Sequence, residues 1–393
     1  MDPRRRPERR LLFAHESADL LKIADAARLS GVLAFDTEFM REKTYYARLC
    51  LVQVAVGDEA WIIDPLKVRD LGPVLEVLRD PAVVKVVHAG SQDLEILTRL
   101  CGSPPTPVFD TQVAATLAGF PSQVGYARLV KDLFDVDLDK SDTFTDWARR
   151  PLTPAQIEYA LSDVRYLPPM YAELMARLEG TGRLDWLDAD FARLSDPATY
   201  EDAAEQQFRR IKRASSLSRR HLGVLQCVAA WREREAQRRD LPRRWVVGDE
   251  TLIEVARRQP TTPDELSAVR GINLRAIGDG GKHLLAAVRR GREMPEADLP
   301  RIVKRPRAIV DVEGVVELMG ALLRVRAVEH GIAVPLLATR ADLERLASGE
   351  RDESPLLEGW RKGLVGDDLV DLIEGRLTLR VADGKVVPEG TAS

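Results

Sequence analysis

The stretch from residue 33 to 65, LAFDTEFMREKTYYARLCLVQVAVGDEAWIIDP, places the strongest constraint on the fold. It holds three apolar runs typical of buried strands, and the first run ends in Asp36 and Glu38. Side chains two positions apart on a strand share a face, so these carboxylates project together. Adjacent carboxylates repel each other and are costly to desolvate, so folding alone does not favour the pair. A divalent cation would stabilise it, because hard cations prefer oxygen ligands. The alternative is a strand that ends at the surface with two solvated acids.

The apolar patterns over residues 11–178 follow an order typical of an α/β domain. Three strand-like runs precede a short helix and a further buried strand, VVKVVHAG, and the pattern is mainly helical from Val108 onward. We expect Ser91 to cap the helix after VVKVVHAG, which puts Asp93 in its first turn beside the end of that strand. This order predicts an α/β domain with a mixed sheet.

Charge divides the chain of 393 residues into an acidic front, a basic middle and an acidic tail. Residues 1–200 carry a net charge of −7, and residues 308–393 carry −6. Between them, 24 basic against 12 acidic residues give residues 208–307 a net charge of +12. Only this middle segment has a charge suited to a polyanion such as a nucleic acid. The alternative is a basic helical face that is merely solvated.

Domain limits follow from these shifts in charge and pattern. The two segments after the α/β domain have helical periodicity and similarly spaced turn residues, which hints at a degenerate repeat. A Pro/Arg-rich stretch predicts a linker between them. The predicted domains are residues 1–205, 208–292 and 310–385.

Several classes of protein find no support in the sequence. Cys50, Cys101 and Cys227 are far apart, which argues against a disulfide framework and a thiolate zinc site and favours a reducing cytoplasm. No apolar run approaches the roughly 20 residues of a membrane span. GDGGKH at residues 278–283 lacks the spacing of a phosphate-binding loop, and no Ser/His/Asp or Cys/His pairing is evident.

A second group of acids extends the candidate site. Asp93 lies at a strand-to-helix junction, and in EYALSDVRYL the residues Tyr159 and Asp163 are four apart, so they share one helical face. With Asp36 and Glu38, these acids can form a four-carboxylate cluster suited to two cations, which can activate a water and stabilise a leaving oxygen in phosphoryl displacement. The Tyr159 hydroxyl could orient that water or help to deprotonate it. The alternative is an aromatic side chain packed in the core.

Longer motifs carry a family resemblance. The strings DTEF, HAGSQDLE and YALSD look like the three exonuclease motifs of the DEDD superfamily, in the subclass with a tyrosine in the third motif. DTEFMREKTYYARLCLVQVA and DWARRPLTPAQIEYALSDVRYL resemble ribonuclease D in particular, and the basic segment resembles the HRDC module, a small helical nucleic-acid-binding domain. The resemblance covers nearly the whole chain. It implies a ribonuclease H-like exonuclease domain with a mixed sheet, followed by two all-helical HRDC-type domains.

The resemblance also implies site residues. The metal ligands of the family fall on Asp36, Glu38, Asp93 and Asp163, and the position that holds the attacking water falls on Tyr159. Two divalent ions, Mg²⁺ or Mn²⁺, are implied at this site.

Three further residues lie beside these motifs. Gln92 stands where many relatives have an acid, which leaves the ligand set intact. His88 and Gln53 lie near the same strand ends, where supporting the core is the better interpretation.

The implied function is a metal-dependent 3′→5′ exoribonuclease of the cytoplasm that releases 5′-monophosphates. Its expected partners are RNA, namely tRNA precursors and single-stranded 3′ ends, without a membrane and as a monomer. Two alternatives stay open: a 3′→5′ DNA exonuclease of the same superfamily, and a non-catalytic RNA-binding scaffold.

Arginine-rich patches give the basic segment a role in this interpretation. The patches lie at residues 209–213, 218–221 and 238–245. Arginine forks suit phosphate oxygens, and Trp231 or Trp245 could stack on a base, although a core position is typical of a tryptophan in a small helical domain. We expect RNA contact driven by shape and charge, with strong salt dependence.

Overall fold

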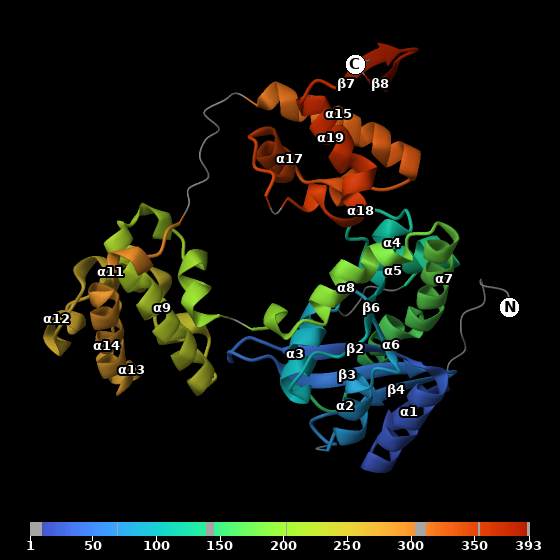
Figure 1. Ribbon diagram of the computed structural model, residues 1–393. Coiled ribbons are helices and arrows are strands. Elements are labelled where there is room, and N and C mark those ends of the chain that lie inside the picture. The colour runs from blue at the N-terminus through green and yellow to red at the C-terminus, as the bar shows by residue number, and fades with distance from the viewer. Residues whose placement is uncertain are drawn as a thin grey trace. The chain divides into compact units, whose positions relative to one another are not determined.

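The computed structural model describes residues 10–68, 70–138, 145–201, 203–302, 312–352 and 354–390. The described residues form two compact units (Figure 1). Among the described residues, the first unit draws on the ranges 10–38, 50–199 and 312–390, and the second on 39–49 and 200–302. Residue 310, where the sequence predicts a third domain to begin, lies outside the described residues, and so do residues 303–307 of the predicted linker at 295–307.

A six-stranded sheet is the centre of the first unit. Its strands lie in the order β1-β4-β3-β2-β5-β6. The pairs β1–β4, β2–β5 and β5–β6 are parallel and β3–β4 is antiparallel, which confirms the predicted mixed sheet. The strand bounds are β1 Arg10–Ala14, β2 Val32–Met40, β3 Arg48–Val56, β4 Glu59–Ile63, β5 Val84–Val87 and β6 Val108–Asp110.

Helices cover both faces of this sheet, with α1 and α2 on one side and α6 and α7 on the other (Figure 1). On the α6 side, Ala34, Ala55 and Val86 from three adjacent strands pack against helix residues such as Val164 of α6 and Leu167 of α7 in one buried cluster. The helix bounds are α1 Ser17–Ser30, α2 Gly72–Arg79, α3 Ser91–Cys101, α4 Thr111–Leu117, α5 Tyr126–Phe134, α6 Pro154–Arg165, α7 Leu167–Gly180 and α8 Asp188–Leu194.

The start of α3 differs from the expected cap. The helix begins at Ser91, the cap position belongs to Gly90, and no side chain caps it. Asp110 at the end of β6 accepts the N–H groups of Ala89 and Gly90 instead, at 3.0 Å each, and so holds the turn that begins α3. The placement of Asp93 in the first turn is confirmed.

The C-terminal part of the first unit is helical up to its end. Its bounds are α15 Glu313–His330, α16 Val334–Leu337, α17 Arg340–Ala347, α18 Gly359–Arg361, α19 Asp367–Ile373, β7 Leu377–Ala382 and β8 Lys385–Gly390. The expectation of an all-helical domain is therefore wrong at the antiparallel hairpin β7–β8. The turn Asp383-Gly384 has positive φ at both residues, 50° and 74°, and Asp-Gly with alternating flanks is a hairpin signal.

The second unit is helical, as its sequence pattern predicts. Its bounds are α9 Arg219–Arg239, α10 Arg243–Val246, α11 Asp249–Arg258, α12 Pro263–Ser267, α13 Leu274–Ile277 and α14 Gly280–Glu293. The long helix α9 supplies much of its buried core, including Val224, Val228 and Trp231. In the order α9, α10, α11, a long helix, a four-residue helix and a shorter helix follow one another, and α15, α16, α17 repeat this order. This parallel agrees with the predicted degenerate repeat. Whether the second copy is an HRDC domain stays a prediction.

In the parts of the chain that the structure describes, no helix is both long and apolar enough to cross a membrane.

Candidate active site

Three acids from β2 and α6 meet on one face of the sheet. Asp36, Glu38 and Asp163 each offer a carboxylate oxygen, and these oxygens lie within 4.8 Å of one another. Ala34 precedes Asp36 by two residues on the same face of β2 and lies in the core with Val164 of α6. The apolar contact between strand and helix thus brings the neighbouring acids together, as their spacing in the sequence predicts.

The start of α6 is fixed by its own side chains. The Thr153 hydroxyl accepts the backbone N–H of Gln156 at 3.1 Å, and the Gln156 side chain accepts the backbone N–H of Thr153 at 2.8 Å. This capping box, with Pro154 at the first helical position, satisfies N–H groups that a helix start leaves unpaired. Because α6 carries both Tyr159 and Asp163, its start sets the height of both side chains above the sheet.

The acids are held in a state that favours their protonated forms. Burial, with repulsion from the other acids, raises the pKa of Asp36 well above its usual value and that of Glu38 to about 8. Burial raises the pKa of Asp163 to about 7, although a hydrogen bond from Tyr159 opposes this. Such shifts mark a cluster whose charges lack compensation within the protein. A bound cation would supply that compensation.

Asp93 lies next to this group but is not part of it. Its Oδ1 accepts the backbone N–H of Thr37 at 3.1 Å and also the Thr37 hydroxyl. Burial raises the pKa of Asp93 to about 6, against the effect of those hydrogen bonds. Repulsion from Asp93 also raises the pKa values of Asp36 and Glu38, so the four acids form one electrostatic group. Thr37 is a residue that the sequence patterns did not single out.

Tyr159 points its hydroxyl at the acids. It donates a hydrogen bond to Asp163, one helical turn later. Its ring contacts the buried Trp147, with centroids 6.0 Å apart and a tilt of 41°. Burial and the nearby acids raise the pKa of Tyr159, so the hydroxyl keeps its proton at neutral pH. The interpretation as a core aromatic fits the ring, whereas the hydroxyl faces the charged cluster.

A clamp holds the segment that carries Trp147. The Arg150 guanidinium donates to both carboxylate oxygens of Asp64, at 2.7 and 2.9 Å, and to the Cys50 carbonyl at 2.8 Å. It also donates to the Trp147 carbonyl at 2.6 Å. A two-point fork of this kind fixes direction as well as distance. The sequence gives no local signal for this clamp, because Asp64 and Arg150 are 86 residues apart.

The residues named beside the motifs have different environments. Both ring nitrogens of His88 are engaged by the protein, at 3.0 Å from the Thr111 hydroxyl oxygen and 3.1 Å from the Val124 carbonyl, which supports the core interpretation. Gln92 is exposed. Gln53 is fully buried, and among the described residues its amide atoms have no hydrogen-bond partner.

The two tryptophans of the basic segment also differ. Trp231 is 6% exposed and belongs to the core, which agrees with the usual expectation for a tryptophan in a small helical domain. Trp245 is 52% exposed, so its indole is accessible to a base. Stacking of RNA on either residue stays a prediction.

Two protein families match separate parts of the chain. A model of a 3′-5′ exonuclease family matches residues 13–179, and a model of the HRDC domain matches residues 221–288. The three clustered acids and Asp93 all lie within the exonuclease match.

Individual relatives match over nearly the full length. The chain is 44% identical to ribonuclease D of Gluconacetobacter diazotrophicus over 370 residues, which cover 94% of each sequence. It is 43% identical to ribonuclease D of Granulibacter bethesdensis over 375 residues, covering 95% of this chain and 94% of that protein. It is also similar to the crystal structure of Escherichia coli RNase D, an exoribonuclease involved in structured RNA processing, with 34% identity and a TM-score of 0.77. That match covers 93% of this chain and 99% of the other.

Proposed function

Because this chain belongs to the ribonuclease D family and is a 3′-5′ exoribonuclease, we propose that it trims the 3′ ends of tRNA precursors by two-metal hydrolysis. Nucleotides would leave one at a time as 5′-monophosphates. The observation that carries this proposal is the convergence of Asp36, Glu38 and Asp163 within 4.8 Å.

The chemistry of the acids fits divalent cations. The ligand atoms are oxygens alone, which suits Mg²⁺ or Mn²⁺, and the raised pKa values show that the cluster lacks a compensating charge. We assign Asp36, Glu38, Asp93 and Asp163 as the residues that hold two ions. Once bound, such ions activate a water and stabilise the leaving oxygen of a phosphodiester.

Tyr159 is assigned to orient the attacking water. A phenol that keeps its proton at neutral pH is a hydrogen-bond donor and a poor base. Its hydrogen bond to Asp163 and its contact with Trp147 fix the direction of the hydroxyl. Of the two roles open to Tyr159 from the sequence, orientation of the water is therefore the one the pKa supports.

The substrate assignment rests on relatives and on charge. The E. coli relative is an exoribonuclease involved in structured RNA processing, and the HRDC match lies in the basic segment of this chain. Arginine-rich surfaces bind RNA through its phosphates, independently of sequence. Single-stranded 3′ extensions of tRNA precursors combine a free end for the acids with a folded body for the basic unit.

The test is a gel time course on a 5′-labelled tRNA with a short 3′ extension, with Mg²⁺, Mn²⁺ or EDTA. We expect a ladder that shortens one nucleotide at a time with either metal, stalls near the mature end, and does not form in EDTA. A matched DNA strand serves as competitor, since it differs at the 2′-hydroxyl. Preferential shortening of DNA would replace the substrate assignment.

The variant Asp36→Asn tests the metal assignment separately. It should bind the tRNA with unchanged affinity and shorten it at least about 100-fold more slowly. Near-normal trimming by this variant would remove Asp36 from the ligand set. RNA binding by the wild-type chain with no product under either metal would favour the scaffold alternative.

A further inference from the structure

A cavity of about 730 Å³ lies within the second unit. Its walls come from two parts of the sequence far apart: the segment between β2 and β3, and the residues around α9, α10 and α11. Pockets for small molecules typically measure about 300–1,000 Å³. This cavity is lined by neither the clustered acids nor Tyr159.

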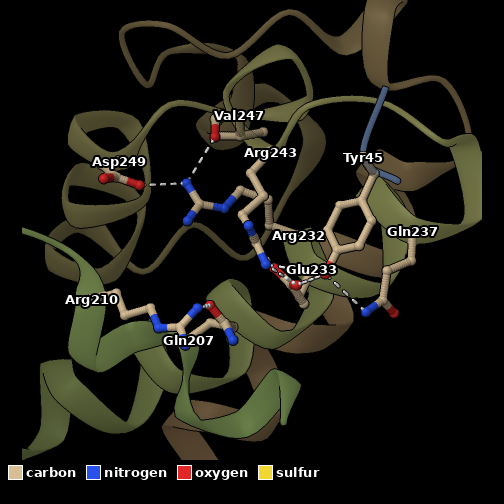
Figure 2. Close-up of polar contacts among 9 residues, drawn as sticks. All are labelled: Tyr45, Gln207, Arg210, Arg232, Glu233, Gln237, Arg243, Val247 and Asp249. Carbon is tan, nitrogen blue, oxygen red and sulfur yellow. Dashed lines mark hydrogen bonds and ion pairs between the residues drawn. The ribbon is translucent and has the colours of Figure 1, made fainter. Parts of the chain in front are cut away.

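A network of charged and polar side chains holds the β2–β3 segment against the helices (Figure 2). The Tyr45 hydroxyl bonds to Glu233, and Gln237 and Arg243 each donate to it at 3.1 Å. Glu233 is fully buried and forms a two-point ion pair with Arg243, at 2.6 and 2.7 Å. The Arg243 guanidinium also lies 4.8 Å from the centre of the Tyr45 ring. The cavity is therefore built by specific contacts and does not depend on a loose fold of the loop.

The charges around the cavity sum to a small positive excess. Five arginines and three acids line it, namely Arg41, Arg210, Arg232, Arg243 and Arg244 with Glu42, Asp249 and Glu250, and the buried Glu233 behind the lining pairs with Arg243. A guanidinium remains charged under all conditions in which a protein is folded, so the arginines keep the cavity attractive to anions. The acids provide acceptors for hydroxyl or amino groups of a larger ligand.

Arg232 is a buried arginine whose charge is only partly compensated. It is 4% exposed, and its Nη1 donates to the Val247 carbonyl at 3.1 Å and to Asp249 at 2.6 Å. Its Nε is buried and has no hydrogen-bond partner among the described residues. The Asp249 side chain is 51% exposed, which weakens its compensation of a buried charge. Arg210 lines the same cavity as Arg232, and both side chains are drawn in Figure 2.

We propose that this cavity binds the phosphate of a nucleotide, either within an RNA strand or as a free nucleoside monophosphate. Guanidinium forks match phosphate oxygens in geometry, and a buried arginine with an unpartnered donor favours a strong acceptor. This inference deepens the proposed function and rests on it, because the nucleotide is that of the substrate or the product.

Two residues of the cavity lie close in sequence to the acids. Arg41 and Glu42 line it, and they follow Glu38 by three and four residues on the segment that leaves β2. A phosphate bound both to Arg41 and to the arginines around α9 and α10 would connect the β2–β3 segment to these helices. The ligand thereby holds the segment that continues directly from Asp36 and Glu38.

The test compares two double variants of the full-length chain, each in an Asp36→Asn background with EDTA so that RNA is not consumed. The cavity variant is Arg41→Ala with Arg244→Ala. The control is Arg257→Ala with Arg289→Ala, which removes two exposed positive charges from α11 and α14, outside the lining. Affinities for a short oligoadenylate, adenosine 5′-monophosphate and inorganic phosphate are measured over a salt series, and thermal melting checks the fold.

We expect the cavity variant to bind oligoadenylate about tenfold more weakly, with a salt slope lower by about 0.7 for each phosphate that the protein no longer neutralises. The control should change affinity less than about twofold. Parallel loss of monophosphate binding would identify the free nucleotide as a ligand, and loss for oligoadenylate alone would identify the strand. Arg244→Ala alone, at an exposed side chain, should show part of the loss if the double variant melts early.

Equal affinities of the cavity and control variants for both nucleotide ligands would overturn the proposal. Loss confined to inorganic phosphate would also overturn it. The wild-type chain is assayed in parallel for metal-dependent shortening of the same oligoadenylate. The wild-type chain is also assayed on the 3′-extended tRNA, and failure to shorten that tRNA with either metal would refute the proposed function, whatever the binding of the variants.

Discussion

Asp36, which we assign to metal binding, lowers the stability of the metal-free fold when it is ionised. Burial and three neighbouring acids raise its pKa, and the pKa values of Glu38, Asp93 and Asp163 are raised to about 8, 6 and 7. An acid with a raised pKa in the fold contributes its full stability below its unfolded pKa, near 4. That contribution is lost as pH rises through the folded pKa values. Without metal, the chain should therefore lose stability between about pH 4 and pH 8.

The substitution Asp36→Asn should stabilise the metal-free chain at pH 8. Asparagine cannot ionise, so it removes repulsion that is present at pH 8 and absent at pH 5. The melting temperature of the variant in EDTA, relative to wild type, should rise by at least about 2 °C between these pH values. Asp25→Asn, at an exposed acid of α1, is the control and should show no such rise. A pH-independent difference for Asp36→Asn would contradict the raised pKa.

Tyr159→Phe should slow catalysis while RNA binding is retained. The change removes the hydroxyl that bonds to Asp163 and leaves the ring that contacts Trp147. We expect kcat to fall by about 10²-fold, within the usual range for loss of a group that orients a reacting water, with KM nearly constant. Steady-state kinetics on a 3′-extended RNA measure both constants. Tyr171→Phe, on α7, removes a phenol whose ring contacts Phe109 and is the matched control. A similar fall in kcat for both variants would remove the special role of Tyr159.

Helix α6 allows a matched test of positioning, because α17 begins with the same kind of capping box. Thr153 and Gln156 cap α6, and Thr339 and Asp342 cap α17. Replacing either threonine by alanine should lower the free energy of unfolding by about 1 kcal/mol. Only Thr153→Ala should also lower kcat, by about three- to tenfold, because α6 carries Tyr159 and Asp163. Chemical denaturation and steady-state kinetics of both variants measure the two effects. An equal loss of activity in both variants would mean that the cap of α6 acts through stability alone.

The sequence predicts those elements whose signals are local. The mixed sheet, the shared face of Asp36 and Glu38 and that of Tyr159 and Asp163 follow from periodicity alone. The hairpin β7–β8 had a local signal in Asp383-Gly384, and the helical pattern before it obscured that signal. Thr37 and Arg150 could not be found in this way, since their partners Asp93 and Asp64 lie 56 and 86 residues away.

The assignment of residues 39–49 to the second unit shows the same limit. In the sequence this segment continues from β2 and carries no helical signal, so its pattern predicts a part of the α/β domain. Its contacts are with residues such as Glu233, 188 positions later, and Asp240, which accepts the backbone N–H of Tyr46 at 3.0 Å. Contacts of this kind depend on which surfaces the finished fold presents.

At the scale of the whole molecule, the C-terminal helices share a unit with the exonuclease domain. Trp186 stacks on Trp360, with centroids 4.7 Å apart and a tilt of 5°, and Arg183 and Arg361 lie over the two indoles. Arg183 also donates to the His330 carbonyl at the end of α15. This stack joins the segment before α8 to α18, so we expect the stability of the two parts to be interdependent.

Trp360→Ala tests that dependence. Loss of a half-buried stacked indole should lower the free energy of unfolding by about 1–3 kcal/mol. If the two parts unfold together, the unfolding transition of the whole first unit shifts to lower denaturant concentration. Metal-dependent activity, measured at increasing denaturant, is then lost at lower concentrations as well. If the C-terminal helices are independent, only their own transition shifts and activity follows the wild-type curve. Trp245→Ala, at the exposed tryptophan, should leave the unfolding free energy within about 0.5 kcal/mol. If Trp360→Ala leaves the unfolding transition of the exonuclease domain unchanged, the C-terminal helices do not stabilise the catalytic fold.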